Sequence, residues 1–184
     1  IVGNVRPNEM DMWVDYFNKI FDFETFVDFK AGDIETKYSA LLSKVVRSPD
    51  NVIKHPVNEP YEGLRKSQIQ EYIEEYRGSG IQHVAIRSDN IFESISALRK
   101  NGVEFLSVPD SYYDALRERK LPLHHNIDDM QEHGILCDWE GEGYLLQLFT
   151  KPIGDRPTSF LNLFNVLENL KDSGKETFVH YSKP

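Results

Sequence analysis

The feature that most constrains the fold of this chain is a pattern of secondary structure that occurs twice. Hydrophobic periodicity in the first 60 residues predicts a strand, a helix and three further strands, at 1–5, 7–20, 21–29, 36–46 and 52–57. After a helix at 66–77, the second half predicts the same series at 83–88, 90–101, 103–106, 135–139 and 144–150, followed by an apolar segment at 160–167. The order strand, helix, strand, strand, strand is therefore repeated.

A module of this kind cannot bury its sheet alone, so two such modules should pack against each other. We expect an α+β fold in which two βαβββ modules close a curved mixed sheet around a shared cavity. The expected parts are a first module at 1–60, a linking helix at 61–80 and a second module at 81–167. The second module contains a helical insertion at 110–133, which Pro122 breaks, and a tail follows at 168–184. When 1–5 is superposed on 84–88, the residue before Ile1 takes the position in the first module that His83 has in the second.

Composition excludes several classes of partner. The 184 residues carry 21 Lys and Arg against 30 Asp and Glu, a formal charge of -9, which argues against nucleic acid and anionic membrane surfaces. No apolar run approaches the roughly 20 residues of a membrane span. The single cysteine, Cys137, lies in an apolar run and is predicted to be a core residue in a reducing compartment. We therefore expect a cytoplasmic protein.

His83 is the first candidate for chemistry. It follows the turn Gly78–Gly80 at the start of an apolar strand, where its ring points to one face of the sheet. A buried hydrogen-bonded histidine and a metal ligand both fit this position. The other histidines are predicted at strand ends, in the insertion or in the tail, with the pair 124–125 in a surface loop: His55, His124, His125, His133 and His180.

Uncharged amides form the second candidate group, because they occur where apolar residues are expected. They are Asn58, Gln68, Gln82 and Gln147. A buried amide without a partner costs about 1–3 kcal/mol, so each must find one. Either these groups form internal hydrogen bonds, or several of them and Ser39 orient a small polar ligand. Phe149 and Phe160 could line such a pocket or fill the core.

Five stretches resemble the C-terminal, catalytic half of 4-hydroxyphenylpyruvate dioxygenase, in register from Ile1 to about Phe160. They are Asn58–Pro60, Lys66–Tyr72, Gly80–Ala85, Phe105–Tyr113 and Gly143–Pro152. The resemblance implies a vicinal-oxygen-chelate fold, similar to glyoxalase and bleomycin-resistance proteins, with a metal in its cavity. It also implies that the family's N-terminal domain is absent from this chain and that the complete protein is a homo-oligomer.

The function implied by the resemblance is Fe(II)-dependent conversion of 4-hydroxyphenylpyruvate and dioxygen to homogentisate, a step of tyrosine and phenylalanine catabolism. The reaction combines oxidative decarboxylation, ring hydroxylation and side-chain migration. In this resemblance His83 is the second histidine ligand, and the first lies before Ile1. The implied catalytic residues are Gln82 and Gln147, and the implied substrate-binding residues are Ser39, Asn58, Gln68, Gln147, Phe149 and Phe160.

The sequence departs from the family at the third metal ligand. Where the family has a glutamate, the register gives Asn162, a neutral and weaker ligand for iron, and Glu168 is a possible substitute. Two alternatives therefore stay open beside the dioxygenase. One is a hydroxymandelate synthase, which would use the same ligands and substrate. The other is a binding homologue that keeps the pocket and has lost turnover.

Overall fold

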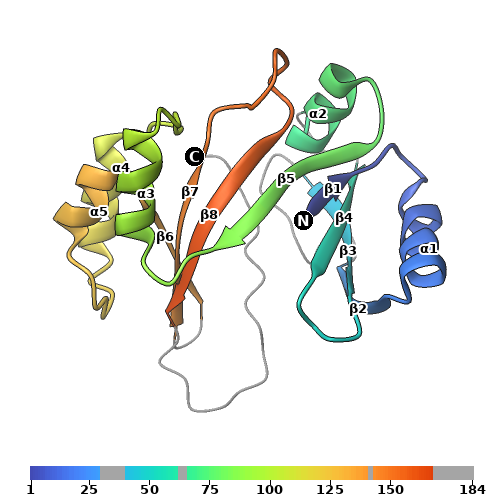
Figure 1. Cartoon of the computed structure of the whole chain (residues 1–184), viewed down its shortest axis with the longest axis horizontal. Coiled ribbons are helices and arrows are strands. Elements are labelled where there is room, and N and C mark those ends of the chain that lie inside the picture. The colour runs from blue at the N-terminus through green and yellow to red at the C-terminus, as the bar shows by residue number, and fades with distance from the viewer. Residues whose placement is uncertain (30–39, 62–65, 141–142, 168–184) are drawn as a thin grey trace. The chain divides into compact units, whose positions relative to one another are not determined.

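The computed structural model describes residues 1–29, 40–61, 66–140 and 143–167. The chain divides into two compact units. The first comprises residues 1–84 and 152–160, and the second comprises residues 85–151 and 161–184. Ser39, Glu168 and His180 lie outside the described residues, and so does the whole of the tail predicted at 168–184. Each unit is described by itself below (Figure 1).

The first unit is a mixed sheet with a helix against it. Its elements are β1 (Val2–Asn4), α1 (Met10–Phe21), β2 (Glu24–Phe29), β3 (Ala40–Arg47), β4 (Lys54–Tyr61), α2 (Gln68–Tyr76) and the first part of β5 (Gly80–Arg87). The strands lie in the order β2-β3-β4-β1-β5. β1 runs parallel to β4, whereas the β1–β5, β2–β3 and β3–β4 pairs are antiparallel.

Helix α1 begins three residues later than the sequence pattern predicts. Asn8 has a positive φ of 67°, which ends the preceding turn and keeps Pro7 outside the helix. The first helical N–H, that of Met10, donates to Glu59 Oε2 at 3.0 Å, so a β4 carboxylate fixes the helix start. The helix then packs on the sheet through a small core of Val5, Met10, Val14, Val46 and Val57.

The second unit has its helices on one face of an antiparallel hairpin and an added strand. Its elements are α3 (Ile91–Lys100), α4 (Asp110–Glu118), α5 (Ile127–His133), β6 (Leu136–Glu140), β7 (Gly143–Phe149) and β8 (Phe160–Leu167), whose first residue belongs to the first unit, together with the end of β5. Asn90 caps α3 by accepting from the Glu93 N–H, and Gly102 follows its end with φ 84°. These limits agree with the helix predicted at 90–101.

The core of the second unit lies between its helices and one face of β6 and β7. The insertion contributes Tyr113, Leu116 and Met130, which pack with residues of α3 and of the strands. Cys137 belongs to this core and is 1% exposed, which confirms its predicted role. The insertion is broken between α4 and α5, as predicted, in the segment that contains Pro122.

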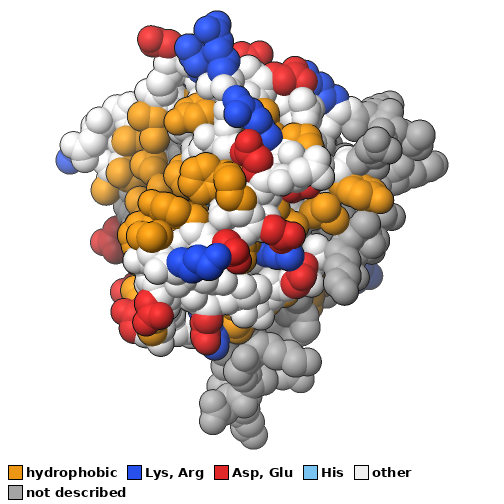
Figure 2. Space-filling model, turned by 90° about the vertical axis from the view of Figure 1, so that its right-hand side faces the viewer, with side chains coloured by type: hydrophobic (Ala, Val, Ile, Leu, Met, Phe, Trp, Pro, Cys, Tyr) orange, Lys and Arg blue, Asp and Glu red, His pale blue; other side chains and the backbone are white. Residues whose placement is uncertain are grey.

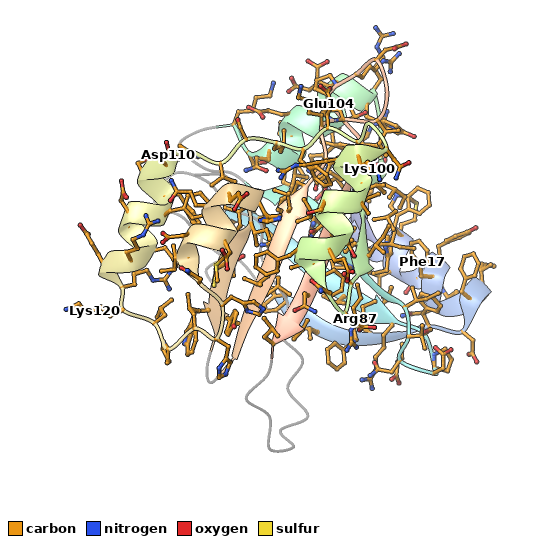
Figure 3. All side chains as sticks on the ribbon, turned by 60° about the vertical axis from the view of Figure 1, so that its left-hand side comes forward. Phe17, Arg87, Lys100, Glu104, Asp110 and Lys120 are labelled. Atoms are coloured by element: carbon orange, nitrogen blue, oxygen red, sulfur yellow. The ribbon has the colours of Figure 1, made fainter. Side chains whose placement is uncertain are left out.

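The predicted strand at 103–106 is wrong. This segment links α3, which ends at Lys100, to α4, which begins at Asp110 (Figure 3). It has one isolated bridge, between Phe105 and Thr150, and a backbone hydrogen bond from Lys151 N–H to the Glu104 carbonyl. Its apolar residues pack against the core of the second unit, and they do not form part of a strand ladder.

The repeat is nevertheless present, with β6 in place of the segment 103–106. The first unit orders its strands β2-β3-β4-β1 and the second β6-β7-β8-β5. Val5 N–H donates to the Asn58 carbonyl at 2.8 Å, and Ser88 N–H donates to the Phe164 carbonyl at 2.7 Å. The sequence superposes Val5 on Ser88, and each of these residues donates to a neighbouring strand of its own unit, so the two equivalent bonds support the predicted superposition of 1–5 on 84–88.

Hydrophobic side chains are exposed on the face that carries α1 (Figure 2). From α1 itself they are Met12, Tyr16, Ile20 and Phe21, between 44% and 63% exposed. The helical spacing of the first three shows that they form the side of α1 turned away from the sheet.

Among the described residues, no helix has the length and apolarity needed to cross a bilayer.

Candidate functional site

His83 lies in β5 of the first unit, in a position that glycine makes available. A Cβ at Gly80 would come within 2.5 Å of Tyr76 Cε1 and 2.8 Å of the Tyr72 hydroxyl oxygen. The absence of that Cβ lets α2 lie close to β5, and the Tyr72 hydroxyl donates to the Ile81 carbonyl at 3.0 Å. The strand that carries His83 is thereby fixed against α2.

The His83 ring is buried and electrically neutral at pH 7. The side chain stacks on Phe160, with ring centroids 4.9 Å apart, and is 8% exposed. Desolvation, followed by the positive charge of the amino terminus, lowers the pKa of His83 to about 4. Nδ1 lies 3.2 Å from Gln82 Oε1, so an N–H on Nδ1 leaves the lone pair on Nε2. A neutral imidazole in this tautomer has the chemistry of a metal ligand.

A row of polar side chains crosses three neighbouring strands of the first unit. Asn58 in β4 is in register with Asn4 in β1 and with Ser43 in β3, so all three share one face. Asn58 Nδ2 donates to Asn4 Oδ1 at 3.5 Å. Asn4 and Ser43 are fully buried, yet Asn4 Nδ2 and Ser43 Oγ have no hydrogen-bond partner among the described residues. Such groups are those that a polar ligand could satisfy.

Ser43 and Asn4 were not identified from the sequence. The signal available for Ser43 was a polar residue within the apolar strand Leu41–Val46, but its partner depends on the β3–β4 register. The two predicted residues nearest to this row in the sequence are Ser39, which lies outside the described residues, and Gln68, which begins α2 and is half-buried. The roles assigned to them stay predictions.

In the second unit, three side chains form a hydrogen-bonded chain across β6, β7 and β8. Gln147 Nε2 donates to Asp138 Oδ2, and Asn162 Nδ2 donates to Gln147 Oε1 at 3.2 Å. Gln147 is 2% exposed and Asn162 is 7% exposed. Desolvation raises the pKa of Asp138, and the bond from Gln147 partly opposes that effect. Asn162 Oδ1 is buried and has no partner among the described residues.

The predicted aromatic residues fall in different units. Phe149 is opposite Asn162 in the β7–β8 ladder, on the same face as Gln147, and is 2% exposed. Phe160 belongs to the first unit and covers the His83 ring. Each ring therefore lies beside a predicted polar site residue of its own unit.

The contacts of His55 and His125 are with neighbouring rings and with backbone or hydroxyl oxygens. His55 is 3% exposed, packs against Phe17 at 4.4 Å between ring centroids, and places Nδ1 2.8 Å from the Ile1 carbonyl oxygen. His124 is exposed, whereas the half-buried His125 places Nδ1 2.8 Å from the Tyr144 hydroxyl. The loop predicted around these two residues is thus anchored to β7.

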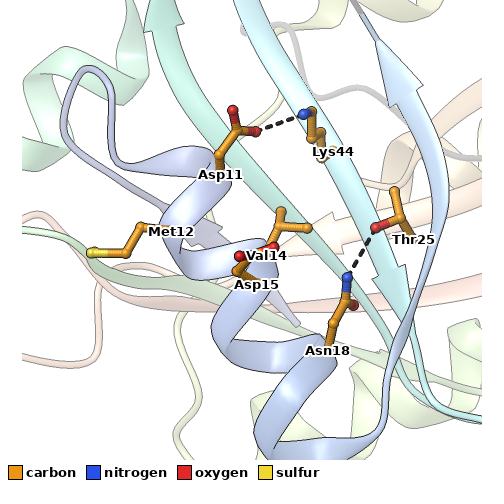
Figure 4. Close-up of a pocket in the computed structure, with 7 residues that line it drawn as sticks. All are labelled: Asp11, Met12, Val14, Asp15, Asn18, Thr25 and Lys44. Carbon is orange, nitrogen blue, oxygen red and sulfur yellow. Dashed lines mark hydrogen bonds and ion pairs between the residues drawn. The ribbon is translucent and has the colours of Figure 1, made fainter.

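A pocket of about 450 Å³ lies elsewhere, between α1 and the strands β2 and β3 (Figure 4). Four of its polar side chains bond in pairs, Lys44 Nζ to Asp11 Oδ1 at 2.6 Å and Asn18 Nδ2 to Thr25 Oγ1 at 3.2 Å, whereas the buried Asn18 Oδ1 has no partner among the described residues. None of the predicted site residues lines it. The lining residues are Asp11, Met12, Val14, Asp15, Asn18, Thr25 and Lys44.

The described residues supply individual metal-ligand groups but not a complete set. His83 offers a neutral imidazole in the first unit, and Asn162 offers an unpaired amide oxygen in the second. Within 1–29, 40–61, 66–140 and 143–167, no group of three His, Cys, Asp or Glu side chains could hold a metal ion. An iron centre of two histidines and a carboxylate therefore does not fit these residues alone.

Comparison with curated proteins finds relatives along almost the whole chain. The 4-hydroxyphenylpyruvate dioxygenase of Yarrowia lipolytica is 49% identical over 166 residues, which are 88% of this chain and 42% of that protein. The 4-hydroxyphenylpyruvate dioxygenase of Tetrahymena thermophila is 44% identical over 168 residues, 89% of this chain and 42% of that protein. The chain thus spans less than half the length of these relatives.

Solved structures with the same fold include a triple mutant of 4-hydroxymandelate synthase from Streptomyces coelicolor. It has a TM-score of 0.74 and 28% sequence identity, over 90% of this chain and 46% of that one. Methylmalonyl-CoA epimerase from Mycobacterium tuberculosis has a TM-score of 0.51 at 13% identity, over 89% of this chain and 85% of that one, and shows the fold alone.

The family model and the solved structures confirm the predicted fold class. The family described as Glyoxalase/Bleomycin resistance protein/Dioxygenase superfamily matches residues 3–133, which is well over half of the chain. The match begins in β1 and includes the five helices of the described residues. The chain therefore belongs to the glyoxalase/bleomycin resistance protein/dioxygenase superfamily.

Proposed function

We propose that this chain is the catalytic part of a 4-hydroxyphenylpyruvate dioxygenase that uses Fe(II) and dioxygen to form homogentisate. The observation that carries the proposal is a buried, neutral His83 held between Gln82 and Phe160, in a chain 41–49% identical to curated dioxygenases of that name. The reaction would belong to tyrosine and phenylalanine catabolism. A cytoplasmic location and a homo-oligomeric state stay predictions.

The residues of the first unit divide into ligand and substrate roles. His83 would hold iron through Nε2, and Gln82 keeps the ring in that tautomer through Nδ1. Asn58 and Ser43 offer polar groups to the 2-oxo acid substrate, as does Gln68 from the start of α2. Ser43 is proposed in addition to Ser39, which keeps its proposed role in substrate binding. Phe160 packs on His83 and limits water at the ring.

The residues of the second unit have matching roles. Gln147 is the proposed catalytic amide and Phe149 the surface on which an aromatic ring packs. Asn162 occupies the position at which the resemblance implies a carboxylate ligand. Its unpaired Oδ1 supports a role as an acceptor, weaker than a carboxylate toward iron.

The test is an assay of the complete gene product with Fe(II), ascorbate and 4-hydroxyphenylpyruvate. We expect oxygen uptake and homogentisate in equal amounts, and loss of both in His83→Ala. His124→Ala is the matched control, because that histidine is exposed and lies in the insertion. Absence of product from an iron-loaded wild-type protein would refute the proposal.

A second candidate is a hydroxymandelate synthase, favoured by the TM-score of 0.74 with the Streptomyces coelicolor protein of that name. Chromatography of the product distinguishes the two, because hydroxymandelate would be formed in place of homogentisate. The identities of 41–49% to dioxygenases favour homogentisate.

A third candidate is a binding homologue without turnover, favoured by the amide at position 162. Metal analysis of the complete gene product tests it. Iron near one equivalent per chain together with product would exclude this alternative, whereas substrate binding without product after Fe(II) loading would support it.

A further inference from the structure

The three polar residues of the second unit lie on one face of three adjacent strands. In the ladder, Asp138 is opposite Leu145, and Gln147 is opposite both Leu136 and Phe164. Since side chains alternate along each strand, Asp138, Gln147 and Asn162 share the face that is turned away from Leu146 and the helices. Their side chains are linked by two hydrogen bonds, Asn162 to Gln147 and Gln147 to Asp138.

The order of donors and acceptors in this chain is set at the Asp138 end. An ionised carboxylate can only accept, so Gln147 must turn its Nε2 toward Asp138. Its Oε1 then faces Asn162 and accepts the Nδ2 hydrogen. The remaining polar atom of Asn162 is Oδ1, an acceptor.

Reversing both amides would require Gln147 to turn its Oε1 toward the Asp138 carboxylate. That contact would place two acceptors together and would lose a charge-assisted hydrogen bond, which is about twice as strong as a neutral one. Without the carboxylate, the two orientations of the amide pair would be similar in their internal hydrogen bonding. Asp138 therefore selects one of two orientations of the amide pair. It acts on Gln147 directly and on Asn162 through Gln147.

We propose that Asp138 is a positioning residue that orients Gln147 and Asn162 so that Asn162 presents its oxygen, making this face selective for cations and hydrogen-bond donors. Asn162 Oδ1 is buried and without a partner among the described residues, as an unused acceptor should be. Phe149, directly opposite Asn162, is 2% exposed on the same face. A ligand that offers an anion or a carbonyl oxygen at this point would be rejected.

Use of that oxygen in catalysis rests on the proposed function, but the orientation of the amides does not. The test is therefore spectroscopic and uses the ¹⁵N-labelled chain without substrate or metal. The side-chain NH₂ signals of Gln147 and Asn162 report the partner of each nitrogen. They can be assigned from their loss in Gln147→Glu and Asn162→Asp.

In Asp138→Asn the selecting charge is lost and the size of the side chain is kept. We expect the Asn162 NH₂ signals to move by more than a linewidth or to split into two sets. Asp89→Asn is the matched control, because Asp89 is exposed and belongs to the same unit. It should leave both signals in place. Asn162 signals that stay unchanged in Asp138→Asn would overturn the proposal.

The double variant Asp138→Asn with Gln147→Glu separates orientation from simple packing. The amide at 138 can donate to the carboxylate at 147, which still accepts from Asn162 Nδ2. We expect a single set of Asn162 NH₂ signals, because a carboxylate again selects one orientation of its neighbours. This variant also carries the test if Asp138→Asn alone does not fold, and two sets of Asn162 signals in the double variant would refute the proposal. Failure of the proposed function would appear only in the product assay.

Discussion

The imidazole of His83 stacks on the ring of Phe160, with centroids 4.9 Å apart and planes inclined by 15°. Burial lowers the pKa of His83 to about 4, and Phe160 supplies part of that burial. We expect Phe160→Ala to raise the pKa of His83 toward its ordinary value of 6.5, because water would reach the ring. An NMR titration of the His83 ring protons measures the change.

Phe23→Ala provides the control for that titration. Phe23 is also a partly buried phenylalanine of the first unit, but it packs with the α1 core. Its removal should lower the free energy of unfolding and leave the pKa of His83 near 4. If the pKa of His83 stays near 4 in Phe160→Ala as well, other groups provide the cover.

Stability should fall in mild acid because two histidines are buried in the neutral form. Desolvation is the main cause that lowers the pKa of both His55 and His83 to about 4, below the ordinary 6.5. The unfolded chain therefore binds protons first as pH falls, and the stabilisation present above about pH 6.5 is lost between pH 6.5 and 4. Between pH 7 and pH 5, protonation of each histidine in the unfolded chain should lower the free energy of unfolding by about 2 kcal/mol.

Urea unfolding at a series of pH values checks this expectation. His55→Phe removes one titrating group and keeps an aromatic ring against Phe17. Its stability between pH 7 and 5 should decline about half as much as that of the wild type. An equal decline would assign the acid sensitivity to other groups.

The elements of this fold could be predicted where the pattern is local. Asn90, a helical period and Gly102 are all within one stretch, and α3 has the predicted limits. The segment 103–106 shows the limit of that approach. Apolar residues there indicate burial, but the ladder partner that would make them a strand is decided by distant residues.

The candidate site was predictable in part for the same reason. His83 and Gln147 stand out in the sequence as polar residues in apolar strands, and both are buried. Ser43 and Asp138 could not be identified, because their importance comes from register. Ser43 is opposite Asn58 in the next strand, and Asp138 reaches Gln147 diagonally across a hairpin.

The close approach of α2 to β5 should make Gly80 intolerant of a side chain. A Cβ there would meet the Tyr72 hydroxyl at 2.8 Å, and Tyr72 is buried and bonded to the Ile81 carbonyl. We expect Gly80→Ala to lower the unfolding free energy by about 1–3 kcal/mol through overpacking. Gly154→Ala is the control, since a Cβ at that position meets nothing within 4 Å. Equal melting temperatures for the two variants would contradict the expected crowding.

The donor order of the second unit predicts how position 162 responds to charge. Asn162→Asp replaces the group that donates to Gln147 Oε1 with an acceptor, so two acceptors would face each other in a buried place. We expect this variant to lose about 1–3 kcal/mol of unfolding free energy. Adding Asp138→Asn should recover most of the loss, because Gln147 can then turn its amide and bond to both neighbours.

Asn165→Asp is the matched comparison for that rescue. Asn165 is on the same strand, is 8% exposed, and donates through Nδ2 to the Ser88 carbonyl at 2.5 Å. The substitution removes a buried donor as Asn162→Asp does, and it should be destabilising to a similar degree. Asp138→Asn should not rescue it, because Asp138 has no hydrogen bond to Asn165 or Ser88 among the described residues. Rescue of both variants would mean that Asp138→Asn stabilises the chain generally and that Asp138 does not act through Gln147.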